Sequence, residues 1–158
     1  MKKIVLMGAV MLSLLVSCKK DKEGATPGEE PINQVEDKTQ LKKECYEGIL
    51  QKDTITLQLN TRGNEVKPGK LRYNFFEKDK NEGIIYGTLS GDTVFATYAF
   101  KSEGRMSKRE VVFLKKGNII IEGYGDVATD SIGDVYFKDK KKLYFDSKVI
   151  LTKQDCHK

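Results

Sequence analysis

The chain has 158 residues, and its 28 lysines and arginines outnumber its 23 aspartates and glutamates to give a formal net charge of +5. This excess is too small to indicate a nucleic-acid partner, because such partners are bound by strongly basic surfaces. Tryptophan is absent and the single histidine, His157, is the penultimate residue, so a catalytic site built on histidine is not expected. The sequence has no glycine-rich phosphate loop between a strand and a helix, and no cofactor is expected.

The first 17 residues have the features of a secretory signal. A positively charged start is followed by an almost wholly apolar run that ends at Val16 and is shorter than the roughly 20 residues that span a bilayer. The run closes with Leu15-Val16-Ser17-Cys18, which resembles the lipobox of bacterial lipoproteins. The resemblance implies cleavage before Cys18 and acylation of its thiol, which would anchor the chain in a membrane. A signal peptide followed by an incidental cysteine is the alternative.

The lipobox resemblance also implies a place in the cell envelope, in the outer membrane, facing either the periplasm or the cell surface. Residues 18–44 are rich in charge and include Pro27 and Pro31, a composition that buries too little apolar surface to fold. They are expected to form a flexible linker, with a helical turn as a weaker expectation for Asn33 to Glu44. The folded domain is expected to span residues 45–158, which is enough for one domain of ordinary size.

From Cys45 onward, apolar and polar residues alternate in short runs between turn residues, which is typical of antiparallel strands. The clearest run is Thr54 to Asn60, in which Ile55, Leu57 and Leu59 point to one face. The other expected strands are Leu71 to Phe75, Gly83 to Leu89, Thr93 to Lys101, Ser107 to Lys115, Ile119 to Tyr124, Val135 to Lys138, Leu143 to Phe145 and Val149 to Thr152.

This pattern predicts an all-β fold of about eight to ten strands. No long helical pattern separates the strands, so hairpins connect them and the sheet is antiparallel. A meander of this length removes its exposed edges by closing. We therefore predict an up-and-down barrel of calycin-like or lipocalin-like size, with an open sheet or a β-sandwich as the alternative. The sequence leaves open whether the many aromatic residues fill this barrel or line a ligand cavity.

Two cysteines flank the expected strands. Cys45 opens the first strand and Cys156 follows the last one, and these strands are neighbours in a closed meander. Because an exported protein meets an oxidising compartment, we expect the two residues to form a disulfide, with two free thiols as the alternative. A zinc site made of Cys45, Cys156 and His157 would lack a fourth ligand and the usual spacing, so no metal site is expected there.

Three aspartates, Asp126, Asp130 and Asp134, recur at four-residue intervals in a stretch that contains glycines. Loops rich in carboxylates can bind calcium, but the EF-hand pattern is missing. We interpret this stretch as a solvated surface loop and keep the three residues as a weak metal-site candidate. The basic groups Lys115–Lys116 and Lys140–Lys142 are interpreted as solvated turn residues, with attraction to an anionic phosphate surface such as lipopolysaccharide as the alternative.

Arg109 and Glu110 point to opposite faces of one expected strand. The position of Arg109 resembles that of the buried arginine that closes one end of calycin barrels, which makes it the candidate for this role. A surface ion pair with Glu103 is the alternative. The stretch Tyr98 to Phe113 also resembles small lipoproteins of Flavobacterium-like Bacteroidota, a resemblance that implies no particular activity.

Two functions are compatible with these observations, and neither is enzymatic. The preferred hypothesis is a lipid-anchored structural or interaction module whose loops contact an envelope protein or block a host enzyme such as lysozyme. The alternative is a lipocalin-like binder of a small apolar ligand or an envelope lipid. A solid core with an exposed, rigid loop favours the first hypothesis, whereas a cavity favours the second. In both, the protein contacts the membrane through the lipid on Cys18.

Overall fold

The computed structural model describes residues 40–156, apart from residues 79, 103 and 147. The signal peptide, Cys18, most of the expected linker, Glu103 and His157 therefore lie outside the described residues. The first strand, β1 (Lys42–Leu50), begins before Cys45. Residues 42–44 are thus extended, and the helical turn suggested for the end of this segment is not formed there.

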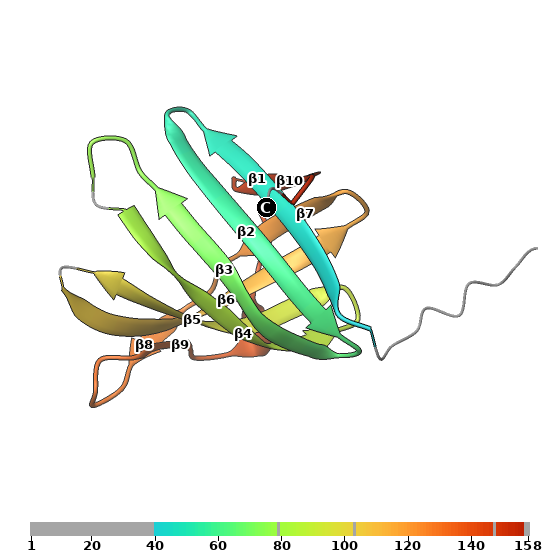
Figure 1. The fold of residues 1–158 in the computed structure, drawn as a ribbon. Helices are drawn as coiled ribbons and strands as arrows, with labels where there is room; N and C mark the ends of the chain where they lie inside the picture. Colours follow the sequence, from blue (N-terminus) through green and yellow to red (C-terminus); the bar gives the residue numbers. More distant parts are fainter. Residues whose placement is uncertain (1–39, 79, 103, 147, 157–158) are drawn as a thin grey trace, which may run out of the picture. The chain divides into compact units, whose positions relative to one another are not determined.

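The described residues contain ten strands, of which eight form a closed antiparallel barrel (Figure 1). Strands β1 to β7 pair in chain order, and β10 lies between β7 and β1. The predicted barrel is confirmed, and the open sheet and the sandwich are not formed. After β1, the elements are β2 (Asp53–Arg62), β3 (Glu65–Asn74), β4 (Lys80–Ser90), β5 (Thr93–Ser102), β6 (Arg105–Lys116), β7 (Ile119–Gly123), β8 (Val127–Thr129), β9 (Val135–Phe137), the 3₁₀ turn η1 (Lys140–Lys142) and β10 (Ile150–Gln154).

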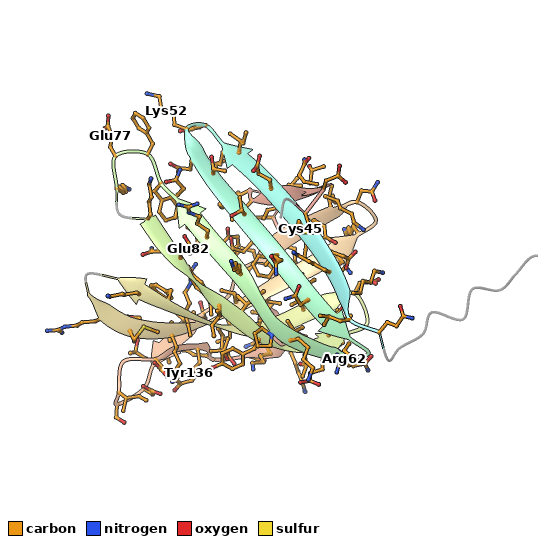
Figure 2. The ribbon with its side chains drawn as sticks, in the orientation of Figure 1. Cys45, Lys52, Arg62, Glu77, Glu82 and Tyr136 are labelled. Carbon is orange, nitrogen blue, oxygen red and sulfur yellow. A yellow bond between two sulfur atoms is a disulfide. The ribbon has the colours of Figure 1, made fainter. Side chains whose placement is uncertain are left out.

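The two ends of the barrel differ in their connections. At one end, β2–β3, β4–β5 and β6–β7 are joined by two-residue turns that begin with Gly63, Gly91 and Gly117, whose φ angles are 56°, 57° and 58°. Glycine adopts such positive φ angles without the strain that a Cβ atom would add. We call this the glycine-turn end, and the opposite end the loop end. Figure 2 shows Arg62 at the glycine-turn end, and Lys52 and Glu77 at the loop end.

The barrel interior is filled by large side chains. The predicted inward face of β2 is confirmed, since Ile55, Leu57 and Leu59 are at most 3% exposed. Each large apolar side chain that is fully buried contributes roughly 1.5–3 kcal/mol to stability. The core consists of Tyr46, Ile55, Leu57, Leu59, Val66, Leu71, Tyr73, Ile85, Val94, Ala96, Tyr98, Val111, Phe113, Ile120, Val149 and Leu151.

Strand β3 is longer than the alternation Leu71 to Phe75 predicts. Its first half contains Pro68 and Gly69, which usually argue against a strand. Here they lie at an irregularity where the register with both neighbouring strands shifts. The side-chain amide of Asn60 donates a hydrogen bond of 2.6 Å to the carbonyl oxygen of Pro68 at this point. The bulge thus accommodates a proline that a regular ladder would exclude.

The segment between β7 and β10 packs against the outside of the barrel. The outward-facing residues Val112 and Ile121 are buried at 0% and 4% exposure. A Cβ atom on Gly123 would lie 2.4 Å from the ring of Phe145, so this close packing requires glycine. The strand predicted over Leu143 to Phe145 is wrong: only a bridge between Tyr144 and Tyr124 forms there, because this segment lies on the barrel wall instead of joining the sheet.

Residues 125–135 are also more ordered than the predicted surface loop. Strands β8 and β9 pair as an antiparallel hairpin that starts in this stretch. Strand β9 makes one parallel pair with β6, between Val135 and Arg109. The hairpin therefore extends the sheet outside the closed barrel.

Candidate functional site

The predicted disulfide between Cys45 and Cys156 is confirmed, with 5.2 Å between the two Cα atoms. Strand β1 pairs with β10 so that Cys45 lies opposite Gln154, which brings Cys156, two residues after β10, next to Cys45. Because both sulfur atoms are bonded to each other, neither cysteine is available as a thiolate ligand for zinc.

A buried ion-pair network lies at the glycine-turn end. Glu44 is 5% exposed, and its two carboxylate oxygens accept hydrogen bonds from Lys115 at 2.5 Å and Lys153 at 3.0 Å. The side chain of Lys115 is only 18% exposed. The interpretation of Lys115–Lys116 as solvated turn residues is therefore wrong for Lys115, which points into the barrel, and holds for Lys116, which is exposed.

The lysines determine the protonation of Glu44. Burial alone raises the pKa of this carboxyl, because a low-dielectric surrounding disfavours charge. The hydrogen bonds and positive charges of Lys115 and Lys153 outweigh burial and lower the pKa to about 2. Glu44 is therefore a carboxylate at neutral pH and holds two ammonium groups in place.

At the loop end, the structure places Arg109 over aromatic rings. Its guanidinium carbon lies 4.8 Å from the ring centre of Tyr73, 5.5 Å from that of Tyr98 and 5.9 Å from that of Phe100. Cation–π attraction of this kind contributes about 0.5–2 kcal/mol per favourable contact. Arg109 thus packs against aromatic residues of the barrel, and its role in closing the barrel stays a prediction.

The same end buries a second glutamate, Glu122, at 7% exposure. The hydroxyl of Tyr73 donates a hydrogen bond of 2.6 Å to its carboxylate. Burial raises the pKa of Glu122, and the hydrogen bond from Tyr73 and the charge of Arg109 offset this effect only in part. Burial and the nearby charge of Glu122 also raise the pKa of Tyr73 well above its usual value.

The turn between β8 and β9, residues 130–134, is organised by one carboxylate, and we call it the hairpin tip. The Asp130 carboxylate accepts hydrogen bonds of 2.9 Å from the backbone amides of Ile132 and Asp134. The backbone adds bonds from the Asp130 amide to the Asp134 carbonyl and from the Gly133 amide to the Asp130 carbonyl. Such side-chain caps fix a turn in one conformation.

The three aspartates, Asp126, Asp130 and Asp134, make different contacts. Asp130 caps the tip, and Asp134 pairs with Lys108 of β6 at 3.4 Å. The backbone carbonyl of Asp126 accepts a bond from the Lys138 amide. Among the residues that the structure describes, no group of three or more His, Cys, Asp or Glu side chains is arranged to hold a metal ion.

Strand β6 fixes the hairpin to the barrel. The carboxylate of Glu110 accepts a hydrogen bond of 2.9 Å from the Phe137 amide and one of 2.6 Å from the ammonium of Lys140. Lys140 of the run Lys140–Lys142 is thus engaged with the barrel, although it remains accessible to solvent. Anchored in this way, the hairpin holds Ile132 at its tip with 77% of the residue exposed.

Sequence reasoning missed Glu44, Glu122 and the hairpin tip. The spacing of side chains along a strand could have identified the two glutamates. Glu44 is two residues from Tyr46 and Glu122 is two residues from Ile120, so each glutamate lies on the same face of its strand as a core residue. A charge at an inward position must find a partner or a shifted pKa. The tip has an Asx-turn signature, an aspartate followed by Ser131 and, two residues later, by Gly133.

Comparison of the chain with family models, with curated proteins and with solved structures gives no match. Within residues 40–156, as far as they are described, no helix has the length and apolar character needed to cross a membrane.

Proposed function

We propose that this chain is a lipid-anchored protein of the cell envelope that acts without catalysis, by binding another protein through its hairpin tip. The observation that carries the proposal is the tip itself: Ile132 is 77% exposed on a turn that Asp130 holds in place. A preorganised loop loses little conformational entropy on binding. An apolar side chain at its end suits insertion into an apolar pocket of a partner.

The surroundings of the tip support a contact surface. Val127 and Tyr136, on the two strands of the hairpin, are 49% and 43% exposed. Figure 2 shows Tyr136 on this outer hairpin. Exposed tyrosines are enriched in protein interfaces, because the ring gives contact area and the hydroxyl a polar contact. The partner we propose is an envelope or host protein with an apolar pocket of the size of one isoleucine side chain.

The alternative function, a binder of a small apolar ligand inside the barrel, has less support. The middle of the barrel is occupied by side chains such as Tyr46, Leu71 and Phe113, each at most 2% exposed. A ligand at this position would have to displace close-packed groups, which costs several kcal/mol.

The binding proposal is tested with a photo-crosslinking residue at position 132 of the full-length protein in its own cells. Position 49 is the matched control, since Ile49 is also isoleucine, is 73% exposed and lies on β1, away from the hairpin. A discrete adduct is expected from position 132 and not from position 49. Adducts of equal yield from both positions, or from neither, would contradict the proposal.

The role of the turn is tested in the same experiment. Asp130→Ala removes the cap of the tip and is expected to lower the adduct yield from position 132 by about tenfold, because the loop must then be ordered on binding. Asp126→Ala removes the same charge outside the tip and should leave the yield within twofold. The anchor is tested separately: Cys18→Ala is expected to abolish acylation and release the protein from membranes.

A further inference from the structure

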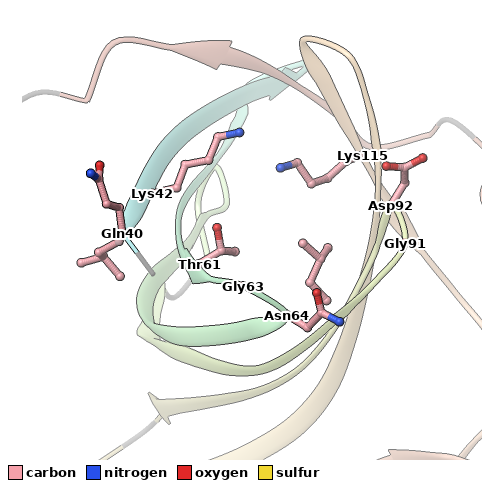
Figure 3. A pocket seen from close by; sticks show the side chains of 10 residues that line it. Gln40, Lys42, Thr61, Gly63, Asn64, Gly91, Asp92 and Lys115 are labelled. Atoms are coloured by element: carbon pink, nitrogen blue, oxygen red, sulfur yellow. The ribbon is translucent and has the colours of Figure 1, made fainter. Parts of the chain in front are cut away.

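The hairpin turns that the structure describes at the glycine-turn end are short and polar. They consist of Gly63–Asn64, Gly91–Asp92 and Gly117–Asn118. Figure 3 shows the side chains of Asn64 and Asp92 at this end, beside a hollow that they help to line. Turns of this composition present amide and carboxylate groups to solvent, as is usual at a protein surface.

The three hairpin connections at the loop end expose large apolar side chains instead. Ile49 and Leu50, which lead into the turn between β1 and β2, are 73% and 44% exposed. Phe76, between β3 and β4, is 47% exposed, and Met106, after the turn between β5 and β6, is 72% exposed. Single exposed apolar residues are common on protein surfaces, but here one end of the barrel collects them in every hairpin connection.

Contacts join two of these connections into one surface. The carboxylate of Asp53 accepts a hydrogen bond of 2.7 Å from the Phe76 amide, and the ammonium of Lys52 lies 4.1 Å from the centre of the Phe76 ring. Met106 is on β6, whose neighbour β5 pairs with the strand that follows Phe76. We give the name apolar rim to the set Ile49, Leu50, Phe76 and Met106.

The backbone beside the rim is strained where the other end uses glycine. Gln51 and Glu77 both have a φ angle of 57°, and they are the non-glycine residues with positive φ in the described part of the chain. Gly63, Gly91 and Gly117 adopt nearly the same angle without strain. Side chains kept at strained positions indicate a demand on these turns other than folding.

We propose that the loop end rests on the lipid surface of the membrane that carries the anchor, with the apolar rim inserted among the headgroups. The inference rests on the acylation of Cys18 proposed above. Apolar surfaces of this kind enter about 5–10 Å into the boundary between headgroups and acyl chains. Lys78 and Arg105, which are exposed beside the rim, then lie at the level of the lipid phosphates.

The tether is long enough for this orientation. The chain enters the barrel at the glycine-turn end, where Lys42 pairs with Thr61. The 24 residues from 19 to 42 span at most about 80 Å when extended, whereas the 10 residues of β2 cover about 33 Å. The tether thus lets the rim reach the same membrane and keeps it nearby, so that a weak contact suffices.

The test uses the absence of tryptophan from the chain, because one introduced tryptophan then reports alone. Met106→Trp labels the rim, and Leu41→Trp labels an exposed position at the glycine-turn end as control. The acylated full-length protein is reconstituted in phosphatidylcholine vesicles with brominated acyl chains, which quench tryptophan only within the bilayer. Met106→Trp is expected to lose most of its emission and Leu41→Trp to keep it. Equal quenching at both positions, quenching of Leu41→Trp alone, or of neither, would overturn the proposal.

A pair of isoleucines gives matched variants in the Met106→Trp background. Ile49→Ser is expected to lower the ratio of docked to undocked barrel by about tenfold, which corresponds to half the burial of one isoleucine. Ile84→Ser, at a 48% exposed position on the outer wall of β4, should change this ratio by less than about twofold. Equal effects of the two substitutions would also overturn the proposal.

The outcomes separate this proposal from the function proposed above. Mass spectrometry shows whether Cys18 is acylated: a missing acyl group would overturn the anchor and this inference together, whereas an acylated protein with unquenched Met106→Trp would overturn this inference alone. Binding through the hairpin tip is not involved, because the vesicles contain no other protein. A lipid is not a second polypeptide, so position 49 remains the control for protein adducts.

Discussion

The two ends of the barrel each bury one glutamate, and the two carboxyls respond to burial in opposite ways. Glu44 and Glu122 are almost equally buried, at 5% and 7% exposure. The pKa of Glu44 falls to about 2 because two lysines bond to it directly. Burial raises the pKa of Glu122, because the hydrogen bond from the neutral hydroxyl of Tyr73 and the charge of Arg109 lower it only in part. Whether a buried carboxyl carries charge therefore depends on whether its partners outweigh the effect of burial, as the two lysines do at Glu44.

This difference gives the two ends opposite pH dependence. The folded pKa of Glu44 lies below its ordinary value of 4.5, so its stabilisation is present above about pH 4.5 and is lost as the pH falls toward 2. The folded pKa of Glu122 lies above its ordinary value, so its stabilisation is complete below pH 4.5 and is lost as the pH rises through the folded pKa. Acid therefore weakens the glycine-turn end and favours the loop end.

The largest effect is expected from removing the disulfide, which joins β1, next to Glu44, to the residues after β10. The bond between Cys45 and Cys156 closes a loop with a sequence separation of 111 residues, and its loss should lower the free energy of unfolding by about 4 kcal/mol. Chemical denaturation of the Cys45→Ser, Cys156→Ser double variant measures this. Hydrogen exchange should show lost protection first around Tyr46 and last around Arg109. Uniform loss at both ends would contradict the separation of the two ends.

Sequence reasoning predicted the features that depend on neighbouring residues. Alternation placed Ile55, Leu57 and Leu59 on the inner face because a strand has a period of two, and closure of the meander brought Cys45 to Cys156. The Glu44 network could not be predicted in this way, because its lysines lie 71 and 109 residues further along the chain. Such contacts depend on the barrel's register and not on local pattern.

The hairpin tip and the first half of β3 escaped prediction for a different reason. Glycine, proline and aspartate are read as turn residues, yet Pro68 lies within a strand at a bulge. Asp130 does cap a turn, but the strands on either side, β8 and β9, have only three residues each. Three residues are too few to show the alternation of apolar and polar side chains that identifies a strand in a sequence. The exposure of Ile132 is therefore visible only in the structure.

The next largest effect is expected from Glu44→Gln. The substitution leaves Lys115 largely buried without its carboxylate, which should cost about 3 kcal/mol at pH 7. Denaturation curves between pH 2 and 7 should show the difference from the wild type shrink below about pH 4.5. The carboxyl of the unfolded wild type takes up a proton there, whereas the folded one keeps its charge until the pH approaches 2. Glu47→Gln is the matched control on the exposed face of the same strand. A pH-independent difference would mean that Glu44 acts by shape and not by charge.

The smallest effect, of opposite sign, is expected from Glu122→Gln at the loop end. Glutamine keeps an oxygen that accepts the hydrogen bond from Tyr73 but carries no charge, so it imitates the protonated carboxyl that burial favours. The variant should gain about 1 kcal/mol at pH 7 and match the wild type near pH 4, where the wild-type carboxyl is itself protonated. Thermal unfolding at both pH values, with Glu47→Gln as control, measures this. A loss of stability at pH 7 that disappears near pH 4 would contradict this prediction, because it would show that Arg109 needs the charge of Glu122.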